Sequence, residues 1–222
     1  MPASQHAAGA PALDLADLTA FDGALEADGD YDGLELDGLD LSGQRANRAR
    51  LTQSRIHDCD LHEVDLRDAL IAECVFDVVQ AGELHAAGAT VRDVLLQQVR
   101  IGSLQAFDAA LTRVTLRNCR LDLVNLRGAE LTDVRFEQCV ISDLDLGSAT
   151  ARRMTFERCR IERLDSFKAD LADVDVSGSE VAAFTEVGHL GGVAINPLQL
   201  AEISSAMASH LGLSVREHDE EP

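Results

Sequence analysis

The chain has 222 residues, of which 39 are Asp or Glu and 19 are Lys or Arg, so its formal net charge is -20 at pH 7. This length is enough for one well-buried domain or two small ones. The negative charge argues against binding to a nucleic-acid backbone or to an anionic membrane, because both would repel the chain. A hydrophobic content of 46% argues against intrinsic disorder.

The sequence carries no sign of export or membrane insertion. The start lacks a basic segment followed by an apolar stretch, and no apolar run reaches about 18 residues. Five cysteines, none of them in a C-x-x-C pair, fit reduced thiols better than a disulfide framework. We therefore expect a cytoplasmic protein with no membrane partner.

The first 30 residues are rich in Ala, Asp and Gly. They are expected to form an acidic, partly disordered leader with a short helix around Leu13 to Ala20. A dense acidic surface follows and continues into the first repeats. Its members are Asp28, Asp30, Asp32, Glu35, Asp37 and Asp40.

A five-residue period then fills most of the chain. Starting at Tyr31 and ending at Val181, every fifth residue is a centre position, and 30 of these 31 centres are hydrophobic. Composition alone would give about 14. A second series, two residues before each centre, is small or apolar almost throughout its first part. Neither a helix nor a strand can bury both series at once, so the backbone must turn a corner every five residues.

Four corners close a coil of 20 residues, and that longer period is also visible as a column of alanines. Its members are Ala49, Ala69, Ala89, Ala109, Ala129, Ala149 and Ala169. The pattern, seen as Ala129-Glu130-Leu131-Thr132-Asp133, resembles the pentapeptide-repeat family over residues 31–181. The resemblance implies an all-β fold, a right-handed quadrilateral parallel β-helix, which we expect over residues 31–186. About 7.5 coils at about 4.8 Å each give a rod of about 36 Å.

The middle of the rod is expected to be loosely packed. The centres Ala81, Ala86 and Ala106 are small, so larger neighbours such as Leu84 and Leu104 have to fill the volume that they leave.

Two phenylalanines lie at positions that should face solvent. Phe107 and Phe167 each follow a small centre, Ala106 and Ser166. They are either exposed contact residues or rings that a local shift turns inward, and the second alternative is favoured.

Beyond Val181 the period stops, and residues 187–216 are expected to form a loop, a helix and a short strand. Asn196 and Pro197 read as the N-cap and first residue of the helix. An apolar stripe on this helix should cover the last coil, and it is followed by the apolar residues of the strand. The stripe consists of Leu200, Ile203, Met207 and Leu211, and the strand adds Leu213 and Val215. This ending resembles the dimerisation module of gyrase-protecting relatives, which implies a homodimer; the alternative is a cap on a monomer. An acidic tail, 217–222, follows.

Sites for chemistry are not indicated. His57, Cys59 and His62 have metal-like spacing, but the repeat register points the histidines outward and the cysteine inward, away from a common point. Cys119, Cys139 and Cys159 recur one coil apart and read as small buried hydrophobes. The main nucleotide and hydrolase motifs do not occur. We expect a non-enzyme with no metal and no cofactor.

Two functions remain open. The resemblance implies a DNA mimic that binds DNA gyrase or topoisomerase IV and modulates quinolone action; the unbroken repeat frame is closer to the loop-free mycobacterial type than to the Qnr type. A basic band on one coil runs against this reading, and it contains Arg152, Arg153, Arg158, Arg160, Arg163 and Lys168. The alternative is a rigid protein-protein interaction scaffold whose partner is unrelated to gyrase.

Overall fold

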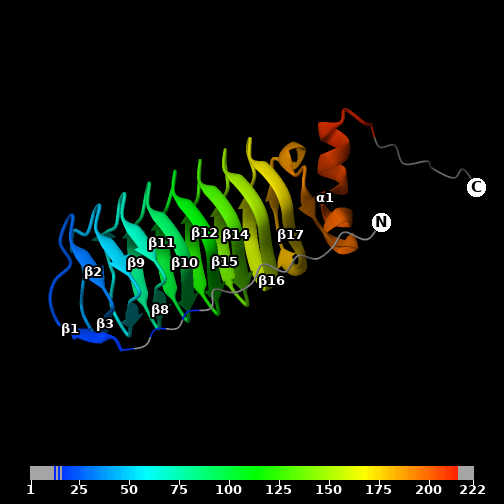
Figure 1. The fold of residues 1–222 in the computed structure, drawn as a ribbon. Coiled ribbons are helices and arrows are strands. Elements are labelled where there is room, and N and C mark those ends of the chain that lie inside the picture. The colour runs from blue at the N-terminus through cyan, green and yellow to red at the C-terminus, as the bar shows by residue number, and fades with distance from the viewer. Residues whose placement is uncertain (1–12, 14, 16, 215–222) are drawn as a thin grey trace, which may run out of the picture.

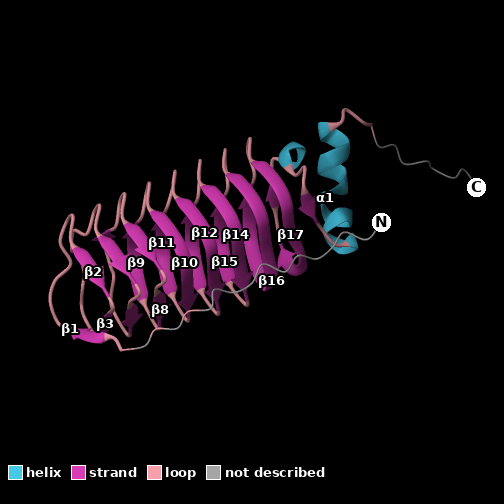
Figure 2. Ribbon diagram, in the orientation of Figure 1, coloured by secondary structure: helices cyan, strands magenta, loops and turns pink. Residues whose placement is uncertain are grey.

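We analysed a computed structural model of the protein, which describes residues 13, 15 and 17–214. The chain winds as a β-solenoid of stacked coils, with one α-helix across its C-terminal end (Figures 1 and 2). All strand pairings are parallel among the described residues. The elements are β1 (Thr19–Phe21), β2 (Asp30–Asp32), β3 (Leu34–Asp37), β4 (Arg50–Thr52), β5 (Arg55–His57), β6 (Val64–Asp65), β7 (Leu70–Ala72), β8 (Val75–Asp77), β9 (Gln80–His85), β10 (Thr90–Gln97), β11 (Arg100–Gln105), β12 (Ala110–Arg117), β13 (Arg120–Asn125), β14 (Glu130–Glu137), β15 (Val140–Asp145), β16 (Thr150–Asp165), β17 (Asp170–Val181), β18 (Phe184–Thr185), η1 (Val187–His189), β19 (Val193–Ala194) and α1 (Pro197–His210).

The strands pair at an offset of one 20-residue coil. Between β10 and β12, Val91 lies beside Leu111, and between β12 and β14, Leu111 lies beside Leu131. Equivalent positions therefore stack in columns along the rod. The predicted quadrilateral β-helix is confirmed.

Most corners of a coil are made by the residue two positions after a centre, which has a left-handed backbone. Asn118 has φ 53°, Gly128 has φ 67° and Asp133 has φ 57°. Glycine and short polar residues reach this region at low cost. Long side chains also occupy it, as at Arg113 and Arg153, and so does the β-branched Val78, which has φ 57° and a side chain that is 41% exposed.

Both inward series form one continuous core. Leu36, Leu121 and Leu144 are almost fully buried, as are the column alanines Ala49 and Ala149. In the sixth and seventh coils Phe136 and Phe156 stack nearly in parallel, with ring centroids 4.8 Å apart. The core therefore follows the two predicted series along most of the rod.

The N-terminal end differs from the prediction. Residues 17–20 are not helical: β1 pairs with β3, with Thr19 beside Leu34. Leu25 is buried, and its amide donates to Oε1 of Gln44 at 2.6 Å. The hydroxyl of Tyr31 accepts from the amide of Glu26 at 2.6 Å. Residues 17–30 thus cap the first coil, because these contacts outweigh the weak helical pattern. Residues 1–12, 14 and 16 of the expected leader lie outside the described residues.

The C-terminal cap begins where predicted. Asn196 is the N-cap of α1 and forms a capping box with Gln199, and Pro197 opens the helix. Gln199 is buried, and its side-chain amide donates to the carbonyl oxygens of Val176 at 3.1 Å and Ser179 at 3.0 Å. Two open carbonyls of the last coil are therefore satisfied by a polar side chain.

The apolar stripe of α1 was predicted to cover the last coil, and this is wrong for half of it. Ile203 is buried and Met207 is half-buried, but Leu200 is 50% and Leu211 is 67% exposed. Leu211–Ser214 form a turn and coil with no strand, and Val215 lies outside the described residues. The described residues include no helix long and apolar enough to cross a membrane.

Candidate interaction surfaces

The predicted acidic surface lies on the cap and first coil, but half of its carboxylates are paired. Asp28 forms an ion pair with Arg48 at 2.7 Å, and Asp30 and Glu35 lie 3.8 and 3.6 Å from the next coil's Arg50 and Arg55. The hydrogen bond from Arg48 lowers the pKa of Asp28.

The other three acidic side chains of that surface form no ion pair with any residue between 17 and 214. Asp37 is exposed, Asp32 accepts a hydrogen bond from Thr52, and Asp40 accepts from the amide of Ser42. The bonds from Ser42 lower the pKa of Asp40.

The basic band is largely neutralised by neighbouring coils. Arg152 pairs with Asp170 and Arg153 pairs with Asp133, both at 2.6 Å. Arg163 pairs with Asp143. Among residues 17–214, Arg158, Arg160 and Lys168 form no ion pair, and the ammonium of Lys168 lies 5.0 Å from the ring centre of Phe167. Half of the band therefore joins coils together.

The same arrangement recurs along the rod, because an acid often lies 20 residues before an arginine. Asp93 accepts two hydrogen bonds from Arg113, as Asp133 does from Arg153. These bonds lower the pKa of both carboxyl groups. Each pair bridges two stacked coils through a bidentate contact, which fixes geometry as well as charge.

We expect these pairs to make the stability of the rod acid-sensitive. Since their folded-state pKa values are lowered, they add stability above the unfolded value of about 3.9, and this stability is lost as pH falls through the lower folded-state values. In urea titrations at several pH values, Asp93→Asn/Asp133→Asn should be less stable than wild type at pH 7. The difference should shrink steadily below about pH 4. A difference that is independent of pH would contradict this account. The control is Asp122→Asn, at an exposed carboxylate that has no ion-pair partner in the described part of the chain.

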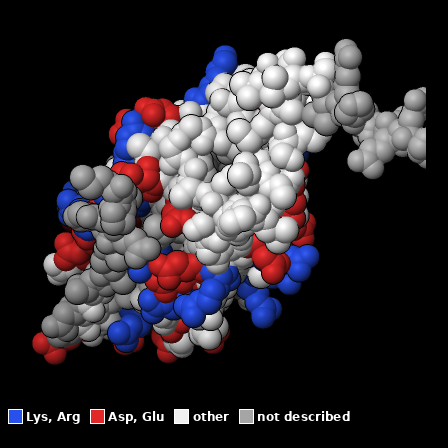
Figure 3. Space-filling model, turned by 90° about the vertical axis from the view of Figure 1, so that its right-hand side faces the viewer, with Lys and Arg blue, Asp and Glu red and all other residues white. Residues whose placement is uncertain are grey.

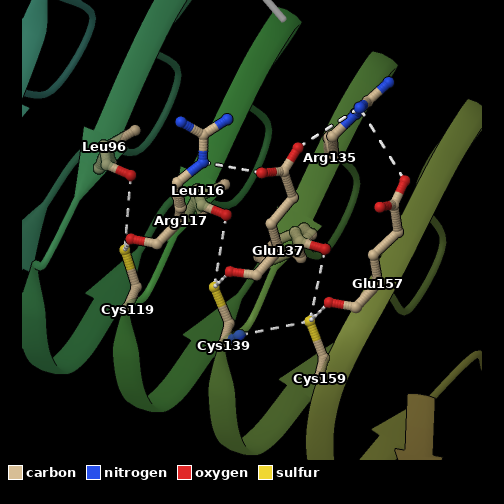
Figure 4. A network of polar contacts seen from close by, with 10 residues as sticks. Leu96, Leu116, Arg117, Cys119, Arg135, Glu137, Cys139, Glu157 and Cys159 are labelled. Atoms are coloured by element: carbon tan, nitrogen blue, oxygen red, sulfur yellow. Dashed lines mark hydrogen bonds and ion pairs between the residues drawn. The ribbon is translucent and has the colours of Figure 1, made fainter. Parts of the chain in front are cut away.

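The cysteine column lies inside the rod beside a surface ion network (Figure 4). Cys119, Cys139 and Cys159 are free and buried, which confirms their reading as small core residues. The thiol of Cys139 donates to the carbonyl oxygens of Leu116 and Glu137, both at 3.4 Å. Such thiols are satisfied within the core and are not available for reaction.

The network above this column centres on Glu137. It accepts from Arg117 at 2.8 Å and lies 3.3 Å from Arg135, which is itself 3.9 Å from Glu157. Burial alone would raise the pKa of Glu137, but the bonds and charges of the two arginines outweigh it and lower that pKa. The cluster binds three coils together.

The two phenylalanines face solvent, so the favoured prediction of an inward turn is wrong. Phe107 is 42% and Phe167 is 36% exposed. Phe167 packs edge-on against His189, with ring centroids 5.6 Å apart. The repeat register holds because Ala106 and Ser166 remain buried at their centre positions. Both rings occupy one column, three coils apart, on the same face of the rod.

The end of the rod covered by α1 is poor in charged groups, as Figure 3 shows for the view onto that end. Leu198 is 69% exposed and Leu213 is 61% exposed, in addition to Leu200 and Leu211. We call these four leucines the terminal apolar surface. The sequence analysis did not identify Leu198 as an exposed apolar residue or Gln199 as a buried one. The three-residue spacing from Asn196 to Gln199, which is a capping-box pattern, was the available signal for Gln199.

The residues from 17 to 214 contain no group of three or more His, Cys, Asp or Glu side chains placed to hold a metal ion. His57 instead lies 3.3 Å from Asp77, and Cys59 is buried. The hollows of the surface are shallow furrows between columns, such as the one at Gly82 and Gly102.

The chain is similar to several solved structures. Among solved structures, a trypsin-treated variant of QnrB1, a plasmid-mediated fluoroquinolone resistance protein, is 14% identical with a TM-score of 0.39, over 90% of this chain and 100% of that one. Full-length QnrB1 is 15% identical with a TM-score of 0.37, over 83% and 100%. HetL, a pentapeptide repeat protein involved in heterocyst differentiation regulation from the cyanobacterium Nostoc sp., is 17% identical with a TM-score of 0.28, over 76% and 90%. No curated protein matches the sequence.

The family assignment comes from two segments of the chain. Residues 35–70 match the description "Pentapeptide repeats (8 copies)", and residues 109–185 match "Pentapeptide repeat region". Together they cover just over half of the sequence, and both lie within the stacked coils. The chain therefore belongs to the pentapeptide-repeat family.

Proposed function

We propose that this protein is a non-enzymatic, cytoplasmic DNA mimic that binds the DNA-binding surface of DNA gyrase or topoisomerase IV and modulates quinolone action. The choice of these enzymes rests on the resemblance of the sequence to the quinolone-resistance branch of the family. The observation that carries the proposal is the charge density of one half of the rod.

The acidic half comprises residues 17–88, with 17 Asp and Glu against five Arg, a balance of -12. This stretch spans about 17 Å of rod, and B-form DNA of that length carries about ten phosphate charges. Residues 89–188 hold 16 acids against 13 bases and are close to neutral. A groove that binds DNA through Lys and Arg is therefore complementary to the N-terminal half alone.

The basic band weakens this proposal less than the sequence indicated. Arg152, Arg153 and Arg163 are engaged by carboxylates of the coils on either side. The positive charges of these three arginines are thus neutralised locally, and the ion pairs stabilise the stacking of the coils. Only Arg158, Arg160 and Lys168 of the band are left without an ion pair among residues 17–214.

A supercoiling assay tests the mimic directly. We expect the protein to inhibit gyrase, or to protect it from a fluoroquinolone, at micromolar concentrations. Asp37→Asn/Asp58→Asn/Asp68→Asn removes three exposed carboxylates of the acidic half that form no ion pair within residues 17–214. It should weaken the effect about tenfold or more, because charge complementarity drives this association. The matched control, Asp108→Asn/Asp122→Asn/Asp173→Asn, changes the net charge equally in the near-neutral half and should retain activity.

Two outcomes would reject the mimic. One is no effect of the wild-type protein on either reaction, and the other is equal loss in the two triple variants. The second would mean that total charge matters and that the acidic half has no special role.

We further propose a homodimer joined through the terminal apolar surface. Leucines exposed at one end of a rod are otherwise unfavourable in water. End-to-end joining would bury them and place the two acidic halves at the outer tips. Such a dimer would present two DNA-like segments separated by near-neutral coils.

Light scattering tests the dimer. The wild-type protein should have the mass of two chains, and Leu211→Asp should have the mass of one, because a carboxylate would be desolvated in the joint. Leu211 is 67% exposed, so the change leaves the core of the rod intact. Ser148→Asp adds the same charge at an exposed corner and should remain dimeric; a monomeric wild-type protein would refute the interface.

A second candidate function, a scaffold for a partner unrelated to gyrase, is favoured by Phe107 and Phe167. Exposed aromatic rings are the side chains that most often anchor protein interfaces. If the supercoiling assay is negative, Phe107→Ala/Phe167→Ala becomes the variant for testing loss of that partner.

A further inference from the structure

The middle coils enclose an apolar cavity of about 90 Å³. Its walls are 18 side chains from the coils between Leu61 and Leu116, and all of them are hydrophobic. Ala86 and Ala106 stand at centre positions that carry leucine in the next two coils, at Leu126 and Leu146. The prediction that neighbours fill this volume is therefore only partly correct.

The exposure of inward side chains marks the same place. Val91, Leu96, Leu104 and Leu111 point into the rod, yet each is only partly buried. Their counterparts in other coils are fully buried, as Leu131 shows for the column of Val91 and Leu111. All four side chains line the cavity.

The two short alanines explain the void. Leu84 and Leu104 lie two residues before Ala86 and Ala106 and line the cavity, but they leave part of it unfilled. Two neighbouring coils already lie in close backbone contact at Gly82 and Gly102. A Cβ on Gly102 would come 2.6 Å from the carbonyl oxygen of Gly82. Stacking at one coil spacing prevents the middle coils from collapsing further onto the gap.

We propose that this cavity is a binding site for small apolar molecules, namely xenon or a hydrocarbon smaller than benzene. A buried water needs two to four polar partners, and these walls provide none. An apolar cavity of about 150 Å³ accepts benzene or xenon, so one of about 90 Å³ suits the smaller ligands. The site is independent of the proposed gyrase surface.

Methyl-resolved NMR of the full chain in xenon-pressurised buffer tests this site. The methyl signals of Val91, Leu104 and Leu111 should shift with xenon pressure and saturate, while those of Leu131 and Leu144 should not move. Ala106→Leu adds three carbons to the cavity and should abolish the shifts. Ala182→Leu adds the same atoms at an exposed position and should leave them unchanged.

Ala86→Val is the second variant, should Ala106→Leu fail to fold; it should reduce the shifts at least threefold. Absence of shifts in the wild-type protein would overturn the proposal. So would equal shifts across all core methyls, which would indicate general partitioning of xenon and no defined site.

Discussion

Replacing Phe136 by Ala is expected to lower the free energy of unfolding by about 3–5 kcal/mol, the usual cost of removing a fully buried aromatic ring. Phe136 is 2% exposed and stacks on Phe156 in the next coil. The substitution therefore removes both transfer energy and an inter-coil contact. Because neighbouring coils interact only with each other, no distant part of the rod can compensate.

Urea denaturation followed by circular dichroism measures this effect. Phe107→Ala is the matched control, because its ring is 42% exposed and should cost about 0.5 kcal/mol or less. An equal loss in both variants would mean that Phe136 does not act as a core residue. The slopes of the two titrations should agree, so that the midpoints report stability alone.

Replacing Gly192 by Ala should detach the C-terminal cap. A Cβ at this position would lie 2.0 Å from the carbonyl oxygen of Leu171, and the backbone has φ +82°. The left-handed conformation alone costs about 1–2 kcal/mol for an L-residue, and the clash with backbone adds to it. Relief requires the segment around β19, which pairs with β17, to move off the last coil.

Amide hydrogen exchange gives the readout for the cap. Exchange in α1 should speed up by at least about 30-fold, which corresponds to about 2 kcal/mol of lost protection. The exposed strand edges of the last coil should also promote aggregation, visible by light scattering. Gly191→Ala is the control one residue away, where a Cβ meets nothing within 4 Å; similar exchange in both variants would contradict the proposed contact.

The stacked coils could be predicted because their pattern is local and repeats. Each residue needs only its position in the five-residue period to be assigned inward or outward, and each coil contacts only its neighbours. The two buried series, the corner positions and the N-cap at Asn196 all follow from such short-range information. The failures lie at the ends, at Ala86 and Ala106, where the centres are small, and at Phe107 and Phe167, whose rings were expected to turn inward.

Ion pairing depended on stacking. Asp133 and Arg153 are 20 residues apart in sequence, and they meet because one coil places them in adjacent layers. The charge count of the segment therefore predicted a continuous basic patch. In the structure, half of the basic side chains of the band form ion pairs with carboxylates. The 20-residue spacing of acid and arginine was the sequence signal that would have revealed this.

The sequence by itself determined the family, the four-sided coil and the identity of most core residues, because a five-residue period with two buried positions leaves one geometry for the backbone. Only the tertiary structure decided which face of α1 is buried, where the rod remains hollow and which charges are free. Those features depend on how the cap, the coils and their side chains fit together in three dimensions. Gln199 is the clearest example: this polar side chain is buried because the last coil presents two carbonyl oxygens to it.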